Sequence, residues 1–215
     1  MMPIRLLAAC VALSLRAEGS RAVYHRMLSL SCARAPYGVR VGWTSGPGDI
    51  LGNGSSTVEY GLSPDALTGV ALGENWTWVD YNNPFGGTNR SYTHHLVELP
   101  SLSPGATYFY RCGDPDDGWS PVASFTAPRA AFSAESPLTV AVFGDLGWTN
   151  AQALTSLQDE ALSSSPPSFF LSLGDYAYNL EYRDGAVGDA FQSAMESITS
   201  TQMYQGVVGN HVRRL

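Results

Sequence analysis

Three glycine-led motifs in the last third of the sequence carry residue types that could do chemistry. They are "GDLG" with Asp145, "GDYAYN" with Asp175 and Tyr178, and "GNH" with Asn210 and His211. In each motif the glycine permits a tight turn just before a polar side chain. Two carboxylates, a phenol, an amide and an imidazole offer oxygen and nitrogen donors, which suit hard or borderline cations better than soft ones. The motifs therefore indicate a metal site.

Each motif comes at the end of a predicted strand. The runs "LTVAVFGDLG" and "SFFLSLGD" are nearly continuously apolar, which is typical of strands buried on both faces, and "GVVGNH" predicts a third, short strand. Between them, apolar spacing predicts a helix over 149–164, with Thr149 as its N-cap, and a second helix over 189–204. This order implies parallel strands joined by helical crossovers. Ligands bind beyond the carboxyl ends of such strands, so we expect the five polar side chains to converge at one edge of the sheet.

The region before these motifs has a different pattern. Residues 24–128 contain short segments rich in β-branched and aromatic residues, separated by Gly, Pro, Asn and Ser. Alternation places two sets of side chains each on one strand face: Val39, Val41 and Trp43, and His95, Val97 and Leu99. About a hundred residues of this kind fit an antiparallel β-sandwich. His94 and His95 are adjacent, so they point to opposite faces of a strand and cannot jointly bind a metal.

The stretch "LPSLSPGATYFYRCG" predicts a specific corner of such a sandwich. Its Leu102, Pro104, Gly105, Thr107 and Tyr108 are similar to the tyrosine corner, in which the Tyr hydroxyl bonds to an upstream turn. We interpret these residues as structural. The segment 129–137 that follows the sandwich is interpreted as a linker.

The N-terminus indicates entry into the secretory pathway. Arg5 precedes a short apolar run, and small residues follow, so residues 1–22 are interpreted as a signal peptide; a frayed N-terminal strand is the alternative. Three sequons predict glycosylation at Asn53, Asn75 and Asn89. Together these features predict a secreted protein, either extracellular or vacuolar.

The cysteines agree with an oxidising compartment. Cys10 would leave with the signal peptide, and Cys32 and Cys112 remain as a pair that could form one disulfide. Sequence alone does not show whether the two cysteines meet.

Composition excludes several classes of partner. The chain has 215 residues, is 44% hydrophobic and carries a net charge of −7, and all 12 of its basic residues are Arg. An acidic chain without basic clusters predicts no binding to nucleic acid or to an anionic membrane. The apolar run at the N-terminus is too short to span a bilayer, and no later run is long enough.

Taken together, the motifs resemble a known family. The ordered set GDxG, GDxxY and GNH is similar to the first three blocks of the metallophosphoesterases, and the tyrosine of GDxxY is typical of the purple acid phosphatases. The stretch "HHLVELPSLSPGATYFYRCG" resembles the fibronectin type III-like N-terminal domain of plant, algal and fungal members. The resemblance implies a β-sandwich domain at 23–129, followed by the first part of an α/β, calcineurin-like metallophosphatase domain at 138–215.

The resemblance also implies a role for each site residue. Asp145 and Tyr178 would bind Fe(III), Asp175 would bridge to a divalent metal (Zn, Mn or Fe), and Asn210 would bind the divalent ion. His211 would contact the phosphate and assist the leaving group. The implied activity is hydrolysis of phosphate monoesters at acidic pH, since two metals can clamp the attacking and leaving oxygens.

The sequence departs from the family after the third motif. The family continues GNH with an acidic residue, whereas this chain has Val212 and then "RRL". Three further histidine ligands that the resemblance implies have no counterpart in the sequence. We therefore expect a chain truncated within its catalytic domain and with little activity alone. The alternatives are a non-catalytic β-sandwich binding module and a gene-model fragment without independent function.

Overall fold

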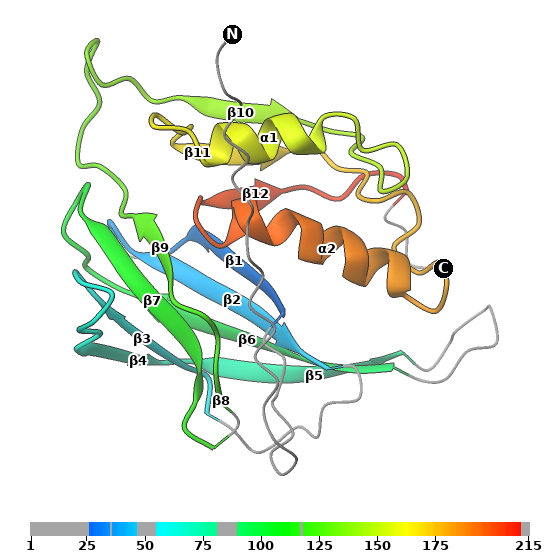
Figure 1. The fold of residues 1–215 in the computed structure, drawn as a ribbon, viewed down its shortest axis with the longest axis horizontal. Helices are drawn as coiled ribbons and strands as arrows, with labels where there is room; N and C mark the ends of the chain where they lie inside the picture. The colour runs from blue at the N-terminus through cyan, green and yellow to red at the C-terminus, as the bar shows by residue number, and fades with distance from the viewer. Residues whose placement is uncertain (1–25, 35, 47–54, 81–89, 117, 212–215) are drawn as a thin grey trace, which may run out of the picture.

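The computed structural model describes residues 26–34, 36–46, 55–80, 90–116 and 118–211. They form a β-sandwich followed by a three-stranded parallel sheet with two helices (Figure 1). This is the predicted fold class, a sandwich domain before the first part of an α/β domain. The predicted signal peptide, Asn53 and Asn89 lie outside the described residues. None of the described helices is both long and apolar enough to cross a membrane.

The sandwich consists of two antiparallel sheets. The first has the strand order β1-β2-β6-β5, with β1 (Arg26–Cys32), β2 (Val39–Ser45), β6 (Arg90–Leu99) and β5 (Glu74–Asp80). The second sheet has the strand order β4-β3-β7-β8, and β9 also pairs with β7. These strands are β3 (Thr57–Gly61), β4 (Gly69–Leu72), β7 (Thr107–Asp114), β8 (Gly118–Trp119) and β9 (Ala123–Thr126).

Side chains that alternate along these strands build the core between the two sheets. Val39, Val41 and Trp43 of β2 are buried there, as are Val97 and Leu99 of β6. The predicted faces are therefore confirmed. The sixth residue of the predicted sets, His95, stacks on the Trp43 ring at 4.7 Å with an interplanar angle of 2°.

The tyrosine corner is present as predicted. The Tyr108 hydroxyl accepts a 3.1 Å hydrogen bond from the backbone N–H of Ser103, in the turn before β7. Gly105 has φ +73°, a left-handed conformation that favours glycine. These residues hold the turn to the sheet, which is the structural role predicted for them.

The two cysteines are not bonded to each other. Cys32 ends β1 in the first sheet and is exposed, whereas Cys112 lies on β7 of the second sheet and is buried. The disulfide allowed by the sequence is thus not formed in the structure, because one thiol lies in the core and the other faces solvent.

The α/β part follows at residue 140. Its elements are β10 (Val140–Phe143), α1 (Leu154–Ala161), β11 (Phe169–Ser172), α2 (Ala186–Thr199) and β12 (Tyr204–Gly206). The three strands form a parallel sheet in the order β10-β11-β12. Both helices pack on one face of this sheet, where Ala161 of α1 and Phe191 and Met195 of α2 share a core with Phe170 of β11.

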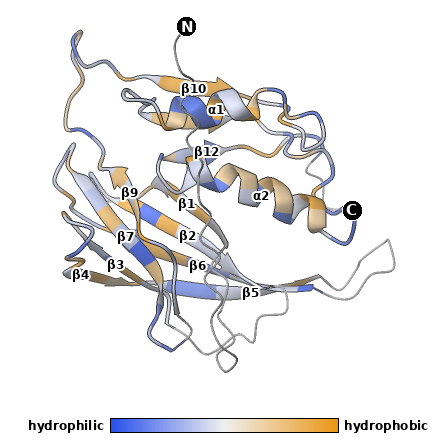
Figure 2. Ribbon diagram, in the orientation of Figure 1, coloured by the Kyte–Doolittle hydropathy of each residue, from blue (hydrophilic) through white to orange (hydrophobic). Residues whose placement is uncertain are grey.

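The opposite face of this sheet is more exposed at β10 than the sequence predicted. Figure 2 shows β10 as a hydrophobic strand, but Val140 is 36% exposed and Val142 is 56% exposed. Burial of this strand on both faces was a wrong expectation for the described residues, because both described helices cover the same face.

Three element boundaries also differ from the sequence prediction. The third strand is Tyr204–Gly206 and not "GVVGNH", because the ring of Tyr204 packs toward Phe143 while Val207 and Val208 stay exposed. The second helix starts earlier and ends earlier than predicted, at Ala186 and Thr199. Thr149 is not an N-cap.

The first helix begins five residues after Thr149, at Leu154, because the segment before Thr149 is hydrogen-bonded to the chain around Ala177. Gly147 forms a parallel bridge with Ala177, and the backbone N–H of Trp148 donates to the Ala177 carbonyl at 3.3 Å. These contacts bind the start of the loop to the segment that follows β11, so the chain becomes helical only beyond them.

The sandwich and the α/β part meet along β1 and α2. Leu30 of β1 forms a parallel bridge with Met203, next to β12, and the Thr199 hydroxyl donates a 2.7 Å hydrogen bond to the Leu28 carbonyl. Both hydrogen-bonding groups are buried. The two parts therefore share backbone hydrogen bonding as well as packing.

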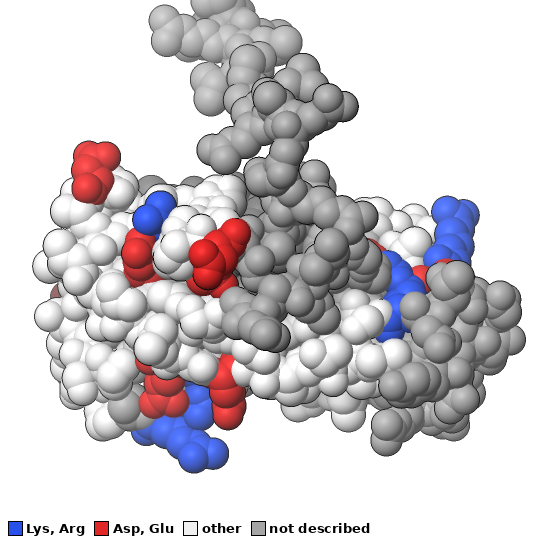
Figure 3. All heavy atoms as spheres, turned by 90° about the horizontal axis from the view of Figure 1, so that it is seen from below, with Lys and Arg blue, Asp and Glu red and all other residues white. Residues whose placement is uncertain are grey.

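Charged side chains on the sandwich are paired across strands. Arg40 lies 3.3 Å from Glu98, and Arg111 lies 2.6 Å from Glu59. On the face that Figure 3 shows, blue basic and red acidic atoms likewise occur in small mixed groups separated by uncharged surface.

Candidate metal centre

Asp145 and Asp175 lie side by side at the carboxyl ends of β10 and β11. Each has a left-handed backbone, with φ 54° and 53°, directly after a glycine. The backbone N–H of Asp145 donates a 3.1 Å hydrogen bond to the Gly174 carbonyl. The two glycine-aspartate turns therefore contact each other and bring both carboxylates to one edge of the sheet.

The third motif packs directly on Asp175. Asp175 is only 7% exposed, and its Oδ1 accepts a 2.7 Å hydrogen bond from the backbone N–H of His211. A Cβ on Gly209 would collide with the Asp175 carboxylate and backbone nitrogen, and one on Gly174 would lie 2.7 Å from the Gly209 nitrogen. The glycines of the second and third motifs are thus required by close backbone approach.

Tyr178 reaches the same edge from a left-handed segment. Ala177, Tyr178 and Asn179 have φ values of 58°, 49° and 83°. The segment is held by the backbone N–H of Ala177, which donates to the Leu146 carbonyl at 2.9 Å. From there the Tyr178 hydroxyl donates a hydrogen bond to the Asp145 carboxylate.

The acidic groups at this edge act on the Tyr178 phenol. The hydrogen bond that Tyr178 donates to Asp145 raises the pKa of Tyr178 to about 12, and the charges of Asp145 and Asp175 act in the same direction. A hard cation among these oxygens would reverse that effect, because it favours the phenolate and balances both carboxylates. The donor set therefore fits a hard, highly charged metal ion.

His211 completes the group. Its ring lies 4.9 Å from the Tyr178 ring, at an interplanar angle of 57°. The structure thus brings together Asp145, Asp175, Tyr178 and His211, and Asn210 immediately precedes His211 in the same turn. In the described part of the chain, no three His, Cys, Asp or Glu side chains form a cluster that could hold a metal ion. The candidate site therefore depends on the phenol and the amide as well.

The predicted glycosylation site that the structure describes lies on the sandwich. Asn75 is exposed on β5, and its side-chain amide donates a 3.3 Å hydrogen bond to the Ser56 hydroxyl. The adjacent histidines act as the strand residues predicted from the sequence: His94 bonds Thr44, and His95 bonds Ser45 and Ser56.

Sequence reasoning missed the residues that support this edge. Tyr176 donates a 2.7 Å hydrogen bond to the Val207 carbonyl, which ties the second motif to the third. On β6, Arg90 contacts Asp184 in the segment between Tyr178 and α2, and Tyr92 contacts Asp189 in the first turn of α2. Alternation on β6 would have placed Arg90 and Tyr92 on one face, but nothing in the sequence indicates what they contact.

Comparison with known proteins shows which family the chain resembles. Residues 27–127 match the family described as "Purple acid Phosphatase, N-terminal domain". The chain is 34% identical over 160 residues to acid phosphatase type 7 of Homo sapiens, which covers 74% of this chain and 35% of that protein. It is 31% identical over 156 residues to purple acid phosphatase 22 of Arabidopsis thaliana, covering 73% and 32%.

A solved structure shares the fold. The structure of a purple acid phosphatase from yellow lupin (Lupinus luteus) seeds superposes with a TM-score of 0.67 at 21% identity, over 90% of this chain and 36% of that one. The chain thus spans about a third of the length of the relatives that it matches.

Proposed function

Since the chain belongs to the purple acid phosphatase family, we propose that it forms part of a secreted acid phosphatase that hydrolyses phosphate monoesters through a dinuclear metal centre. The observation that carries this proposal is the convergence of three motifs at one sheet edge. There Tyr178 donates to Asp145, and Asp175 accepts from His211.

The described residues have separate roles in this proposal. Asp145 and Tyr178 would hold Fe(III), Asp175 would serve both this ion and a divalent Zn, Mn or Fe ion, and Asn210 would bind the divalent ion. When bound, the metals supply a nucleophilic hydroxide and stabilise charge on the phosphate. His211, beside the Tyr178 ring, donates a proton to the leaving oxygen of the ester.

The secretory features belong to the same proposal. Residues 1–22 are a signal peptide, residues 23–129 are the N-terminal sandwich domain, and residues 138–215 begin the phosphatase domain. Asn75 is exposed on β5, which supports its use as a glycosylation site.

Metal binding by the 215-residue chain tests the proposal. Fe(III) supplied as the nitrilotriacetate complex is expected to bind, and binding is expected to be lost in the Asp145→Ala and Tyr178→Phe variants. Asp114→Ala is the matched control, because Asp114 is a buried carboxylate on β7 of the sandwich. Equal Fe(III) binding by the parent chain and both site variants would contradict the proposed centre.

Turnover is a separate measurement. Because His211 is the only His among the five candidate site residues, we expect little hydrolysis of p-nitrophenyl phosphate by this chain. Turnover that disappears in Asp175→Ala would overturn that expectation and would strengthen the assignment of the site.

A further inference from the structure

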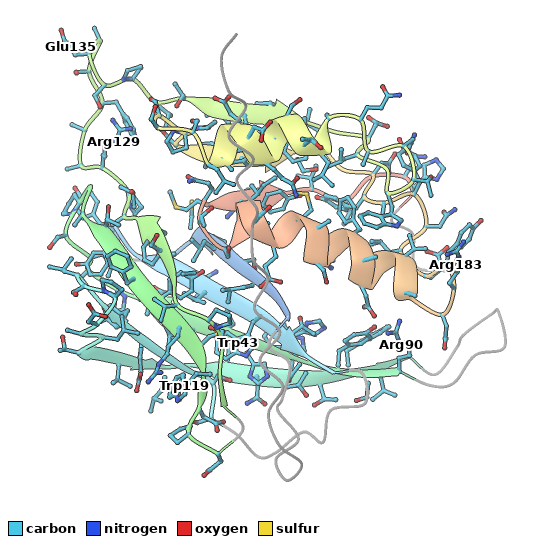
Figure 4. The ribbon with its side chains drawn as sticks, in the orientation of Figure 1. Trp43, Arg90, Trp119, Arg129, Glu135 and Arg183 are labelled. Atoms are coloured by element: carbon cyan, nitrogen blue, oxygen red, sulfur yellow. The ribbon has the colours of Figure 1, made fainter. Side chains whose placement is uncertain are left out.

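Two side chains of the sandwich reach the segment that carries Tyr178. The Arg90 guanidinium donates to the backbone carbonyl of Asp184 and lies 2.5 Å from a carboxylate oxygen of Asp189. The Tyr92 hydroxyl donates a 2.9 Å hydrogen bond to the other oxygen of that carboxylate. Figure 4 shows Arg90 below the N-terminal end of α2, on the same side as Arg183. One strand thus contacts both the loop and the helix that follow Tyr178.

The loop needs such support, because its backbone is unfavourable. Besides the left-handed residues 177–179, Arg183, Asp184 and Gly185 have φ values of 54°, 59° and 79°. Left-handed residues other than glycine cost free energy and persist only where the surroundings hold them in place. Two such clusters lie within nine residues, and Tyr178 is in the first of them.

Arg90 fits the second cluster closely. A Cβ on Gly185 would collide with its guanidinium, so the glycine leaves the space that Arg90 occupies. The side chains of Arg90 and Asp189 are only 15% and 19% exposed, so water screens their attraction weakly. Asp189 also lies in the first turn of α2, where the helix dipole favours a carboxylate. These contacts fix where the loop ends and where α2 begins.

We infer that Arg90 and Tyr92 are positioning residues for the metal centre. Through Asp184 and Asp189 they hold the segment 177–189 so that the Tyr178 hydroxyl stays against Asp145. The sandwich therefore takes part in building the centre, although none of its side chains belongs to the candidate donor set. This inference rests on the proposed function, in which Tyr178 is a metal ligand.

Fe(III) titration of the 215-residue chain tests the inference through the visible ferric–tyrosinate absorption. Arg90→Met removes the charge and the hydrogen bonds but keeps a long apolar side chain. We expect it to weaken Fe(III) binding by roughly tenfold, because the segment would then hold the Tyr178 hydroxyl less firmly against Asp145. Arg40→Met is the matched control, since it breaks the Arg40–Glu98 pair on the same sheet without touching the segment. It is expected to bind Fe(III) as the parent chain does.

A second readout does not involve the metal. Arg183 is a trypsin site within the loop, and cleavage after it requires the loop to open. We expect Arg90→Met to be cut at Arg183 several-fold faster than Arg40→Met. If Arg90→Met does not fold, Tyr92→Phe replaces it, because that change removes only one hydroxyl and leaves the ring in place.

The outcomes separate the inference from the proposed function. If Tyr178→Phe keeps the absorption of the parent chain, Tyr178 is not a ligand and the proposed function fails. If the absorption requires Tyr178 but Arg90→Met and Tyr92→Phe behave as Arg40→Met does in both assays, the inference is overturned. A loss of absorption with unchanged cleavage at Arg183 would also overturn it, because Arg90 would then not act through the loop.

Discussion

The hydroxyl of Tyr110, buried in the core of the sandwich, donates a 2.7 Å hydrogen bond to the carbonyl of Ser200, the C-cap of α2. One residue earlier, Thr199 donates to Leu28 of β1. With Arg90 and Asp189 at its other end, α2 is bonded to the sandwich at both termini. The helix therefore belongs to both parts of the molecule.

Tyr110→Phe should loosen this attachment. The change removes the donor to Ser200 and is expected to lower the free energy of unfolding by about 1–2 kcal/mol, because the partly buried carbonyl loses its partner. Hydrogen exchange followed by mass spectrometry should show faster exchange in the last turn of α2. Tyr108→Phe serves as the control, since its hydrogen bond lies within the sandwich. Equal exchange in α2 for both variants would contradict the attachment.

Gly209→Ala should damage the candidate metal centre without unfolding the sandwich. The added Cβ collides with Asp175, so the third motif must shift, at a cost of about 1–3 kcal/mol. Fe(III) binding is expected to fall at least about tenfold. Gly144→Ala is the comparison, because the nearest atom to its Cβ would be the Leu173 Cβ, at 3.3 Å. Similar binding losses in the two variants would show that space at Gly209 is not the limiting factor.

Stability should decline below neutral pH partly because of His94. Burial lowers the pKa of His94 below its ordinary value of 6.5, so the unfolded chain binds a proton at a pH where the folded chain does not. The contribution of the neutral ring is therefore complete above pH 6.5 and falls as the pH drops below it. Urea unfolding at pH 7.5 and 5.5 should show a smaller decrease in stability for His94→Gln than for the parent chain. An equal decrease would mean that other groups cause the pH dependence.

The thiols should differ sharply in reactivity. Burial raises the pKa of Cys112 to about 12, whereas Cys32 is exposed. Only the thiolate reacts, so Ellman's reagent at pH 8 should modify Cys32 and leave Cys112 unmodified until urea is added. Peptide mapping without reduction identifies the modified residues. A peptide in which Cys32 and Cys112 are linked would instead establish the disulfide that the sequence allowed.

The parts of the structure that sequence predicted are those set by short-range rules. Alternation placed Val97 and Leu99 in the core, and a glycine before a carboxylate located Asp145 and Asp175 at one sheet edge. The tyrosine corner was found because its residues are consecutive. In each case a few neighbouring residues determine the geometry.

The parts that sequence missed depend on distant partners. Arg90 and Asp189 are separated by 99 residues, and neither carries a local signal of the other. The first helix starts late because Gly147 pairs with Ala177, which also cannot be read from the helix itself. The exposed face of β10 is likewise set by which face both helices cover. Pattern alone describes elements and motifs, and tertiary contacts decide their limits.

The bridge between Leu30 and Met203 affects how such proteins can evolve by recombination. The family match ends at residue 127, which suggests a module that genes could exchange. Hydrogen bonding crosses that border, however, because β1 near the start of the sandwich pairs with the chain beside β12. A hybrid gene that joined the sandwich of one protein to the α/β part of another near residue 128 would combine β1 and α2 from different proteins. The contacts between β1 and α2 would then not match. Its sandwich would fold against a mismatched neighbour, so exchange of the two parts as a unit is favoured over exchange of either one alone.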